Sequence, residues 1–280
     1  MKKIIVFYHK ECPDGFGGAW AAWKKLGAKA DYVGLKPGEA PEFEVKGKEV
    51  YVIDSAFPEE AAKKILKNNE KLVVLDHHFS NAERVKISTE NVYQMNHSGS
   101  VIAWNYFHPK RPAPIFLKYV EDADIWKWTL PNSKAMAMLR EGLAFDFKVW
   151  SRWVADFENS KKRKSFAAQG QQLLNYSNAL QDRAIENAQI VEFEGHKCLA
   201  VNSPLLHSDI GHKLSKLMPP FGIVWSEKAD LRAVSLRSNG KFDVSMLAKK
   251  YGGGGHKAAA AFRLTLKEKL PWKYMGPFSS

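Results

Sequence analysis

The chain has few cysteines, no long apolar run and no internal repeat. Cys12 and Cys198 are the two cysteines among 280 residues, too few for a disulfide framework and typical of a reducing compartment. We therefore expect a cytoplasmic protein. No stretch of about 18 apolar residues occurs, so no membrane span is expected. The apolar run at residues 4–8 is too short for a secretion signal and is better interpreted as a core strand.

Positive charge exceeds negative charge. The chain has 42 Lys and Arg against 30 Asp and Glu, a net charge of +12. A basic chain favours anionic partners such as nucleotides or nucleic acid, although dispersed lysines also simply keep a surface soluble. The dense basic run at residues 161–164 is typical of a solvated helix. With 45% hydrophobic residues, the chain is long enough for two globular domains.

The first 130 residues alternate short apolar runs with helical patterns, which predicts an α/β domain with a doubly wound, mainly parallel sheet. The expected strands are 4–8, 49–53 and 72–75, and the expected helices are 17–26, 58–67 and 98–107. Residues 131–189 have a helical composition and are expected to connect the first domain, 1–130, to a smaller α/β domain at 190–280.

The second expected domain begins with a hairpin signal. Residues 190–193 and 197–201 flank Glu194-Gly195-His196, a typical turn between two strands. Further strands are expected at 222–225, 231–236 and 261–266, and helices at 207–217 and 243–249. The tail after Lys267 carries no clear pattern.

Three polar motifs follow the expected strands of the first domain directly. They are His9-Lys10-Glu11-Cys12-Pro13-Asp14-Gly15, Asp54-Ser55 and Asp76-His77-His78. The carboxyl ends of parallel strands share one edge of a sheet, where ligands bind, so we expect these side chains to converge.

A divalent metal site is the function that this set of side chains favours. Clustered carboxylates repel one another unless cations compensate them, and carboxylate with imidazole suits Mn²⁺, Mg²⁺, Fe²⁺ or Zn²⁺. Two such ions would bind a phosphoryl group and activate water. Taken singly, Asp54 could be a helix cap, His9 an ordinary polar residue and Cys12 a small buried apolar residue. The combination is more specific than any member.

Two further regions are candidates for ligand binding. Asp122 and Asp124, flanked by aromatic residues, could complete the metal set or solvate a helix end. Four glycines at 252–255 precede His256 and an alanine run, which predicts a loop entering a helix, where backbone N–H groups bind an anion. Arg237, at the end of an expected strand, can bind phosphate with its guanidinium fork.

These motifs together resemble the DHH phosphoesterase superfamily, which is named for the sequence present here as Asp76-His77-His78. The stretch from Ser235 to His256 resembles the DHHA1 domain of the exonuclease and nano-RNase, or oligoribonuclease-like, branch. The resemblance covers about residues 1–130 and 190–265. It implies a Mn²⁺-dependent phosphohydrolase with two lobes and a cleft between them.

The resemblance also implies a role for each motif residue. His9 and Cys12 would bind one metal ion, Asp14, His77 and Asp122 the other, and Asp54 would bridge them. Asp122 is preferred over Asp124 because it fits the spacing to the aromatic residues better. Asp76 and His78 would complete the catalytic site, with His78 contacting the phosphate or assisting the leaving group. The substrate would be bound by the residues Arg237, Gly253, Gly254, Gly255 and His256.

One position departs from the family pattern, in which the first motif carries two aspartates separated by one residue. Here Cys12 stands where the first aspartate is usual. A thiolate is a softer ligand than a carboxylate and would shift preference toward Zn²⁺ or Fe²⁺. The alternative is that Cys12 does not bind metal and that one metal site is weak.

The leading functional hypothesis is a metal-dependent phosphodiesterase acting on very short oligonucleotides or dinucleotides. A RecJ-like single-strand exonuclease is the second, and a nucleotide-binding sensor that has lost turnover through Cys12 is the third. The DHHA1-like end counts against the inorganic pyrophosphatase branch. We expect a nucleotide or short oligonucleotide as substrate and no membrane partner. The sequence is compatible with a homodimer.

Overall fold

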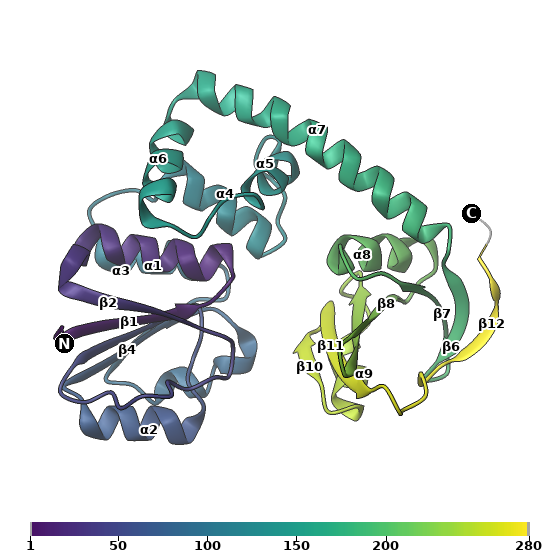
Figure 1. The fold of residues 1–280 in the computed structure, drawn as a ribbon, viewed down its shortest axis with the longest axis horizontal. Coiled ribbons are helices and arrows are strands. Elements are labelled where there is room, and N and C mark those ends of the chain that lie inside the picture. Colours follow the sequence, from purple (N-terminus) through teal and green to yellow (C-terminus); the bar gives the residue numbers. More distant parts are fainter. Residues whose placement is uncertain (1, 279–280) are drawn as a thin grey trace. The chain divides into compact units, whose positions relative to one another are not determined.

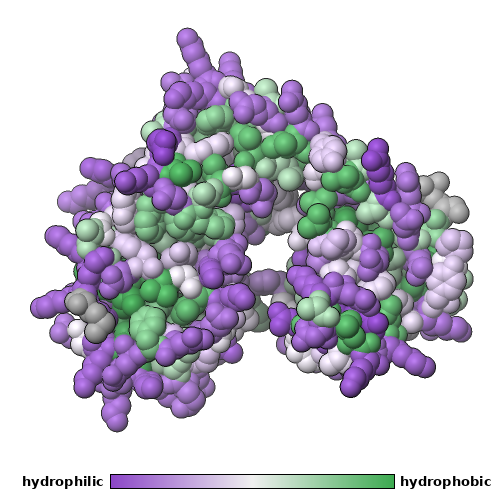
Figure 2. All heavy atoms as spheres, viewed as in Figure 1, coloured by the Kyte–Doolittle hydropathy of each residue, from purple (hydrophilic) through white to green (hydrophobic). Residues whose placement is uncertain are grey.

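A computed structural model describes residues 2–278, and the chain divides into two compact units, Met1–Leu174 and Asn175–Ser280. The boundary lies within helix α7 (Ser160–Ile185), inside the stretch 131–189 that was expected to be helical (Figure 1). In Figure 2, hydrophilic side chains project from each unit over the hydrophobic ones. Within residues 2–278, no helix combines the length and apolar character needed to cross a bilayer.

The first unit is built on a five-stranded sheet in the order β2-β1-β3-β4-β5, and every neighbouring pair is parallel. The α/β class with a parallel sheet is therefore confirmed. The three central strands are apolar and buried, as parallel strands covered on both faces must be. The strands are β1 (Ile4–His9), β2 (Ala30–Leu35), β3 (Glu49–Ile53), β4 (Lys71–Asp76) and β5 (Glu90–Tyr93).

Helices cover both faces of this sheet (Figure 1). α1 (Pro13–Leu26) and α3 (Gly99–Phe107) pack on one face, and α2 (Glu59–Asn68) packs on the other. Three more helices extend the core on the α1 side, where Phe116 and Trp150 are buried with Trp20. These helices are α4 (Ile115–Asp124), α5 (Ser133–Arg140) and α6 (Phe147–Glu158), and the short 3-10 turns are Gly27–Lys29, Phe79–Asn81 and Arg84–Lys86.

The second unit contains a mixed seven-stranded sheet in the order β10-β11-β9-β8-β7-β6-β12. The predicted hairpin is present, because β6 and β7 pair antiparallel. α8 (His207–Leu217) packs on one face, and α9 (Val244–Lys250) packs on the other. The strands are β6 (Gln189–Phe193), β7 (His196–Asn202), β8 (Phe221–Lys228), β9 (Leu231–Ser238), β10 (Gly254–His256), β11 (Ala259–Thr265) and β12 (Lys273–Pro277).

The prediction of a helix after the glycine run is wrong. Gly254–His256 instead form β10, which pairs antiparallel with β11. The alanines at 259–261 alternate between the core face and the outer face of the sheet, because Ala260 is buried and Ala261 is exposed. This period of two is the signature of a strand. No helix N-terminus follows the glycines, so no helix is present there to bind an anion.

Two glycines allow α1 and α3 to lie directly against the end of β3. A Cβ atom at Gly18 would come within 2.3 Å of Ile53 Cγ2, and a Cβ atom at Gly99 within 2.6 Å of Asp54 Cβ. Both distances are shorter than real Cβ contacts. Only glycine therefore lets these helices approach the strand end that carries Asp54.

Substituting Gly18 tests this close approach. We expect Gly18→Val to lower the free energy of unfolding by about 1–3 kcal/mol, because the added side chain overpacks the contact with Ile53. Urea unfolding followed by circular dichroism measures the change. Gly142→Ala is the control, since the nearest atom to its added Cβ is Leu139 O at 3.9 Å, and it should stay within about 0.5 kcal/mol. Equal effects would contradict the packing described.

Candidate functional site

Polar side chains gather at the carboxyl edge of the parallel sheet in the first unit. His9 ends β1, Asp54 follows β3, and Asp76 ends β4. The start of α1 adds Cys12 and Asp14, the end of α4 adds Asp124, and the chain after β4 adds His77 and His78. The convergence expected from parallel topology is present.

Asp54 lies at the centre of this cluster and is 2% exposed. Its Oδ2 atom is 3.1 Å from His9 Nδ1 and 3.7 Å from Cys12 Sγ, and its Oδ1 atom is 3.2 Å from His77 Nε2. The two carboxylate oxygens therefore face two different groups of side chains. Asp54 also has a φ of +58°, in the left-handed region that a non-glycine residue rarely adopts. The backbone strain is tolerated where it directs this carboxylate into the cluster.

Asp14 is held by the N-terminus of α3. Its Oδ2 atom accepts a hydrogen bond from the Gly99 N–H at 2.6 Å, and its Oδ1 atom accepts one from the Ser100 N–H at 3.0 Å. A helix N-terminus stabilises negative charge in this way. Nevertheless burial, followed by the charge of Asp54, raises the pKa of Asp14 to about 6. The hydrogen bonds do not fully offset the burial of Asp14 and the charge of Asp54.

Asp124, and not Asp122, faces the cluster. Asp124 Oδ2 is 3.4 Å from His77 Nε2, and Asp14 Oδ2 is 3.8 Å from the same nitrogen. A quarter of the Asp124 side chain is exposed. Even so, its burial and the charges of Asp14 and Asp54 raise its pKa well above the ordinary value. These three residues form one of the groups that could hold a metal ion.

Asp122, the aspartate that the sequence favours as a metal ligand, makes its hydrogen bonds to the loop after α4. Asp122 Oδ1 accepts hydrogen bonds from Thr129 N at 2.9 Å and Thr129 Oγ1 at 2.8 Å, and its Oδ2 accepts one from Leu130 N at 3.2 Å. It closes the loop after α4. Residues two apart on a helix point about 200° apart, so one of the two aspartates faces the cluster and the other faces away from it.

Asp76 orients the two histidines that follow it and is fully buried. Its Oδ1 atom accepts hydrogen bonds from the backbone N–H groups of His77 and His78 and from His78 Nδ1 at 2.8 Å. Its Oδ2 atom accepts one from Asn81 Nδ2 at 2.6 Å. With its lone pairs used in this way, Asp76 supports the site more than it offers a ligand. Sequence reasoning missed Asn81.

Opposing effects set the protonation of the cluster. Burial alone would raise the pKa of Asp54, but hydrogen bonds from His77 and His9 hold it below its ordinary range. Burial alone would lower the pKa of His77, but its hydrogen bond to Asp54 and the charges of Asp14 and Asp54 raise it to about 9. Protonated histidines thus partly offset the negative charge of the carboxylates. A bound metal cation would offset that charge fully.

The donor set fits divalent metal ions. Three groups place one ligand atom of each member within 4.8 Å of the others, and the members of these groups are Asp54-Asp76-His77-His78, His9-Cys12-Asp54 and Asp14-His77-Asp124. Carboxylate oxygen and imidazole nitrogen suit Mn²⁺, Fe²⁺ and Zn²⁺. Burial and the charges of neighbouring aspartates raise the pKa values of Asp14 and Asp124, and a bound cation would offset both effects. Asp54 belongs to two of the groups, as a bridging carboxylate would.

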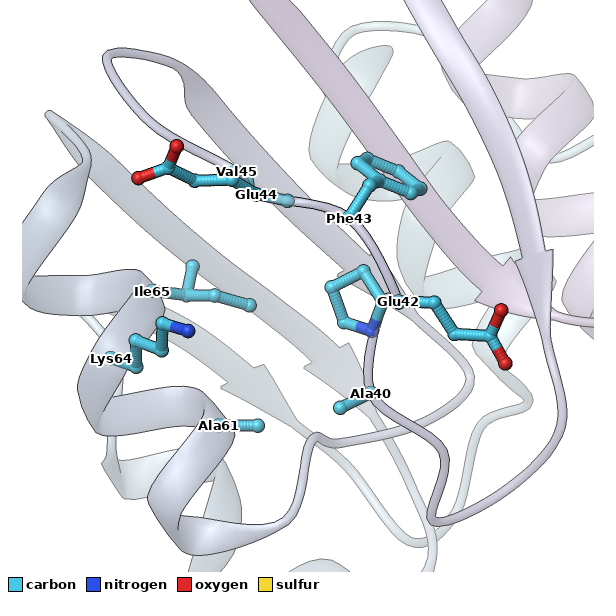
Figure 3. A pocket seen from close by; sticks show the side chains of 9 residues that line it. Ala40, Glu42, Phe43, Glu44, Val45, Ala61, Lys64 and Ile65 are labelled. Carbon is cyan, nitrogen blue, oxygen red and sulfur yellow. The ribbon is translucent and has the colours of Figure 1, made fainter.

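A separate surface hollow of about 300 Å³ lies in the same unit, lined by residues before β3 and by α2. Figure 3 shows Phe43, Lys64 and Ile65 around it. None of its lining residues belongs to the Asp and His cluster. The hollow is therefore not the metal site.

In the second unit, Arg237 and His256 lie on one face of the sheet. Arg237 pairs with Ala259, which pairs with His256 across the next strand. Directly opposed residues share a face, and two strand spacings separate the outer pair by about 10 Å. Arg237 Nη2 donates to Ser208 Oγ at 3.0 Å and Nη1 to Leu236 O at 2.9 Å, which fixes the guanidinium. Sequence reasoning missed Ser208.

The glycines before His256 serve the hairpin. A Cβ atom at Gly253 would come within 2.2 Å of Ala261 O, and one at Gly255 within 2.5 Å of Ala259 O. Gly255 also has a φ of +143°, which side chains disfavour. A Cβ atom at Gly254 would meet no atom within 4 Å. Close packing of the strands therefore requires glycine at positions 253 and 255. Gly254 pairs with Ala261 on the neighbouring strand, and the space beside it is open.

Comparison with known proteins matches part of the second unit to a described family. Residues 212–271 match the DHHA1 domain family. The chain is 29% identical over 296 residues to uncharacterized protein R106 of Acanthamoeba polyphaga mimivirus, covering 96% of this chain and 69% of that protein.

Two solved structures are similar along nearly the whole chain. The pGpG-specific phosphodiesterase PggH from Vibrio cholerae has a TM-score of 0.52 at 12% identity, covering 95% of this chain and 94% of that one. An uncharacterized protein from Helicobacter pylori G27 has a TM-score of 0.46 at 16% identity, covering 94% of this chain and 93% of that one. The likeness to PggH agrees with the α/β fold described above.

Asp124 and Asp122 should respond differently to mutation. We expect Asp124→Asn to weaken Mn²⁺ binding at least about tenfold. Even the loss of a residue that only supports a metal ligand lowers metal affinity by about that factor. It should also leave the metal-free protein as stable or more stable at pH 7, because it removes a carboxylate whose pKa is raised by its neighbours. Isothermal titration and urea unfolding measure the two effects.

Asp122→Asn is the matched control. It should lower the free energy of unfolding by about 1–3 kcal/mol, because it disturbs hydrogen bonds to a buried carboxylate, and it should leave the Mn²⁺ affinity within about twofold. The reverse pattern, with Asp122→Asn losing metal and Asp124→Asn losing stability, would restore the assignment made from sequence.

Proposed function

We propose that the chain is a member of the DHH phosphoesterase superfamily and a metal-dependent phosphodiesterase acting on dinucleotides or very short oligonucleotides. The observation that carries this proposal is the convergence of Asp14, Asp54, His77 and Asp124 at one edge of the sheet. The name of PggH, a pGpG-specific phosphodiesterase, supports a linear dinucleotide as the substrate class.

The first unit would supply the hydrolytic chemistry. A bound divalent ion supplies an activated water and neutralises charge on the phosphoryl oxygens. Asp54 would contribute one oxygen to each side of the centre, since Oδ2 faces His9 and Oδ1 faces His77. Asp14 would keep its orientation through the two N–H groups of α3. Such hydrogen bonds would hold the carboxylates in place for a metal ion and a substrate.

His78 is the residue we assign to the substrate's scissile phosphate. Its Nδ1–H donates to Asp76 Oδ1 at 2.8 Å, which holds the ring and its tautomer as a carboxylate partner does for a catalytic histidine. Nε2 is then the atom placed to hydrogen-bond the phosphate or to deliver a proton to the leaving oxygen. Asp76 is a positioning residue for this step.

The second unit would bind the rest of the substrate. The Arg237 guanidinium offers a planar fork that fits a phosphate, and His256 lies on the same sheet face two strands away. Ala259 lies between Arg237 and His256, and Ala261 lies two residues further along the same strand. The small side chains of both alanines leave this face of the sheet open. A spacing of about 10 Å suits one or two nucleotides and favours a short substrate over a long strand.

Removing Asp54 should abolish hydrolysis. With Mn²⁺ present, we expect the unmodified protein to cleave a dinucleotide, and we expect Asp54→Ala to slow cleavage at least about a hundredfold, since it removes a central charge of the reaction centre. Chromatographic separation of mononucleotide product gives the rate. Asp230→Ala, in the exposed β8–β9 turn, is the control and should keep full activity. Intact dinucleotide with Mn²⁺, Mg²⁺, Fe²⁺ and Zn²⁺ alike would refute the proposal.

Removing the phosphate-binding groups should act on substrate affinity. We expect Arg237→Ala to raise KM by about 10- to 100-fold, because a charged hydrogen bond of about 1.5–3 kcal/mol is lost, while Mn²⁺ affinity stays unchanged. Arg263→Ala is the control, because Arg263 lies on the same strand face as Ala259 but four residues away. Steady-state kinetics with a dinucleotide gives both constants.

A length series completes this experiment. Dinucleotides should be cleaved faster than longer single strands. Preference for long single-stranded DNA would favour the RecJ-like exonuclease instead, and nucleotide binding without any turnover would favour a sensor.

A further inference from the structure

Cys12 contributes a sulfur atom to a cluster whose other potential metal ligands are carboxylates and imidazoles. Its Sγ atom is 3.7 Å from Asp54 Oδ2, and His9 Nδ1 is 3.1 Å from the same oxygen. Ligand atoms of these three residues lie within 4.8 Å of one another. This group offers one sulfur, one nitrogen and one oxygen. The neighbouring group of Asp14, His77 and Asp124 offers two carboxylates and one imidazole.

We propose that the metal centre is chemically asymmetric, with Cys12 binding one ion as a thiolate together with His9 and Asp54. This first position would take a borderline ion such as Zn²⁺ or Fe²⁺, because thiolate favours softer ions. The second position, at Asp14, His77 and Asp124, would take a harder ion such as Mn²⁺ or Mg²⁺. The inference rests on the proposed function, because it takes the cluster to be a metal centre.

The local backbone places the sulfur for this role. Cys12 is the residue that immediately precedes α1, in an extended conformation, and its carbonyl accepts the first hydrogen bond of the helix, from Phe16 N–H. A helix N-terminus favours a thiolate over a thiol. The backbone N–H of Gly15 acts on the sulfur in the same direction.

The carboxylates around Cys12 act in the opposite direction. Burial, followed by the charges of Asp54 and Asp14, raises the pKa of the Cys12 thiol. A cation among these groups reverses the electrostatic effect, as metal ions do for coordinating thiols. On binding, the Sγ–H bond breaks, a bond from sulfur to the metal forms, and the proton leaves to solvent.

The second cysteine provides an internal comparison. Cys198 lies in β7 and is fully buried in the apolar core of the second unit. The three potential metal-binding groups do not include it. Any spectroscopic signal of a metal–thiolate bond should therefore depend on Cys12 alone.

Cobalt titration tests the proposal directly. Co²⁺ would be added to the metal-free, reduced protein while absorption is recorded, because a bond from thiolate to Co²⁺ gives an intense near-ultraviolet charge-transfer band. We expect the band in the unmodified protein and in Cys198→Ser. We expect Cys12→Ser and Cys12→Asp to lose the band while still binding Co²⁺ through the remaining ligands. Competition between Zn²⁺ and Mn²⁺, followed by calorimetry, should show the ratio of their affinities falling at least about tenfold in Cys12→Asp.

The outcomes separate this inference from the proposed function. Co²⁺ binding with no charge-transfer band in the unmodified protein, or an unchanged Zn²⁺ to Mn²⁺ ratio in Cys12→Asp, would overturn the thiolate assignment alone. Absence of Co²⁺, Zn²⁺ and Mn²⁺ binding in every variant would overturn the metal centre and the proposed function with it.

Discussion

The whole arrangement depends on keeping several carboxylates close together in a poorly solvated place. Asp14, Asp54 and Asp76 are almost fully buried, and Asp124 lies beside them. Such groups repel one another and lose hydration, so the fold must compensate them. It does so with backbone N–H groups at the start of α3 and with histidine side chains. The remaining imbalance appears as raised pKa values of Asp14 and Asp124.

This imbalance lowers the stability of the folded chain in a way that depends on pH. The folded-state pKa of Asp14 is raised from 3.8 to about 6, so the native state binds more protons than the unfolded state between these values. The contribution of Asp14 to stability therefore falls as pH rises through that window and stays unfavourable at neutral pH. A bound cation would remove the penalty. Such trade-offs between stability and activity are common at reaction centres.

The sequence was sufficient to predict the centre of the fold and most of the cluster. The apolar strands β1, β3 and β4 and the polar residues that end them were identified, because burial on both faces gives parallel strands a strong pattern. The edge strands β2, β5 and β12 are not predicted, since few or none of their residues are fully buried. Asp122 was preferred to Asp124 because spacing alone does not show which side of α4 faces the sheet edge. The run at 258–261 predicts a helix because alanine suits helices, but the pairing of β11 with β9 and β10 overrides that propensity.

Anomalous X-ray diffraction from crystals grown with Mn²⁺ would locate the bound ion. We expect an anomalous peak at the manganese edge beside the Asp54 carboxylate and within coordination distance of Asp14, His77 and Asp124. Peaks located elsewhere, with these side chains hydrogen-bonded only to one another, would contradict this expectation.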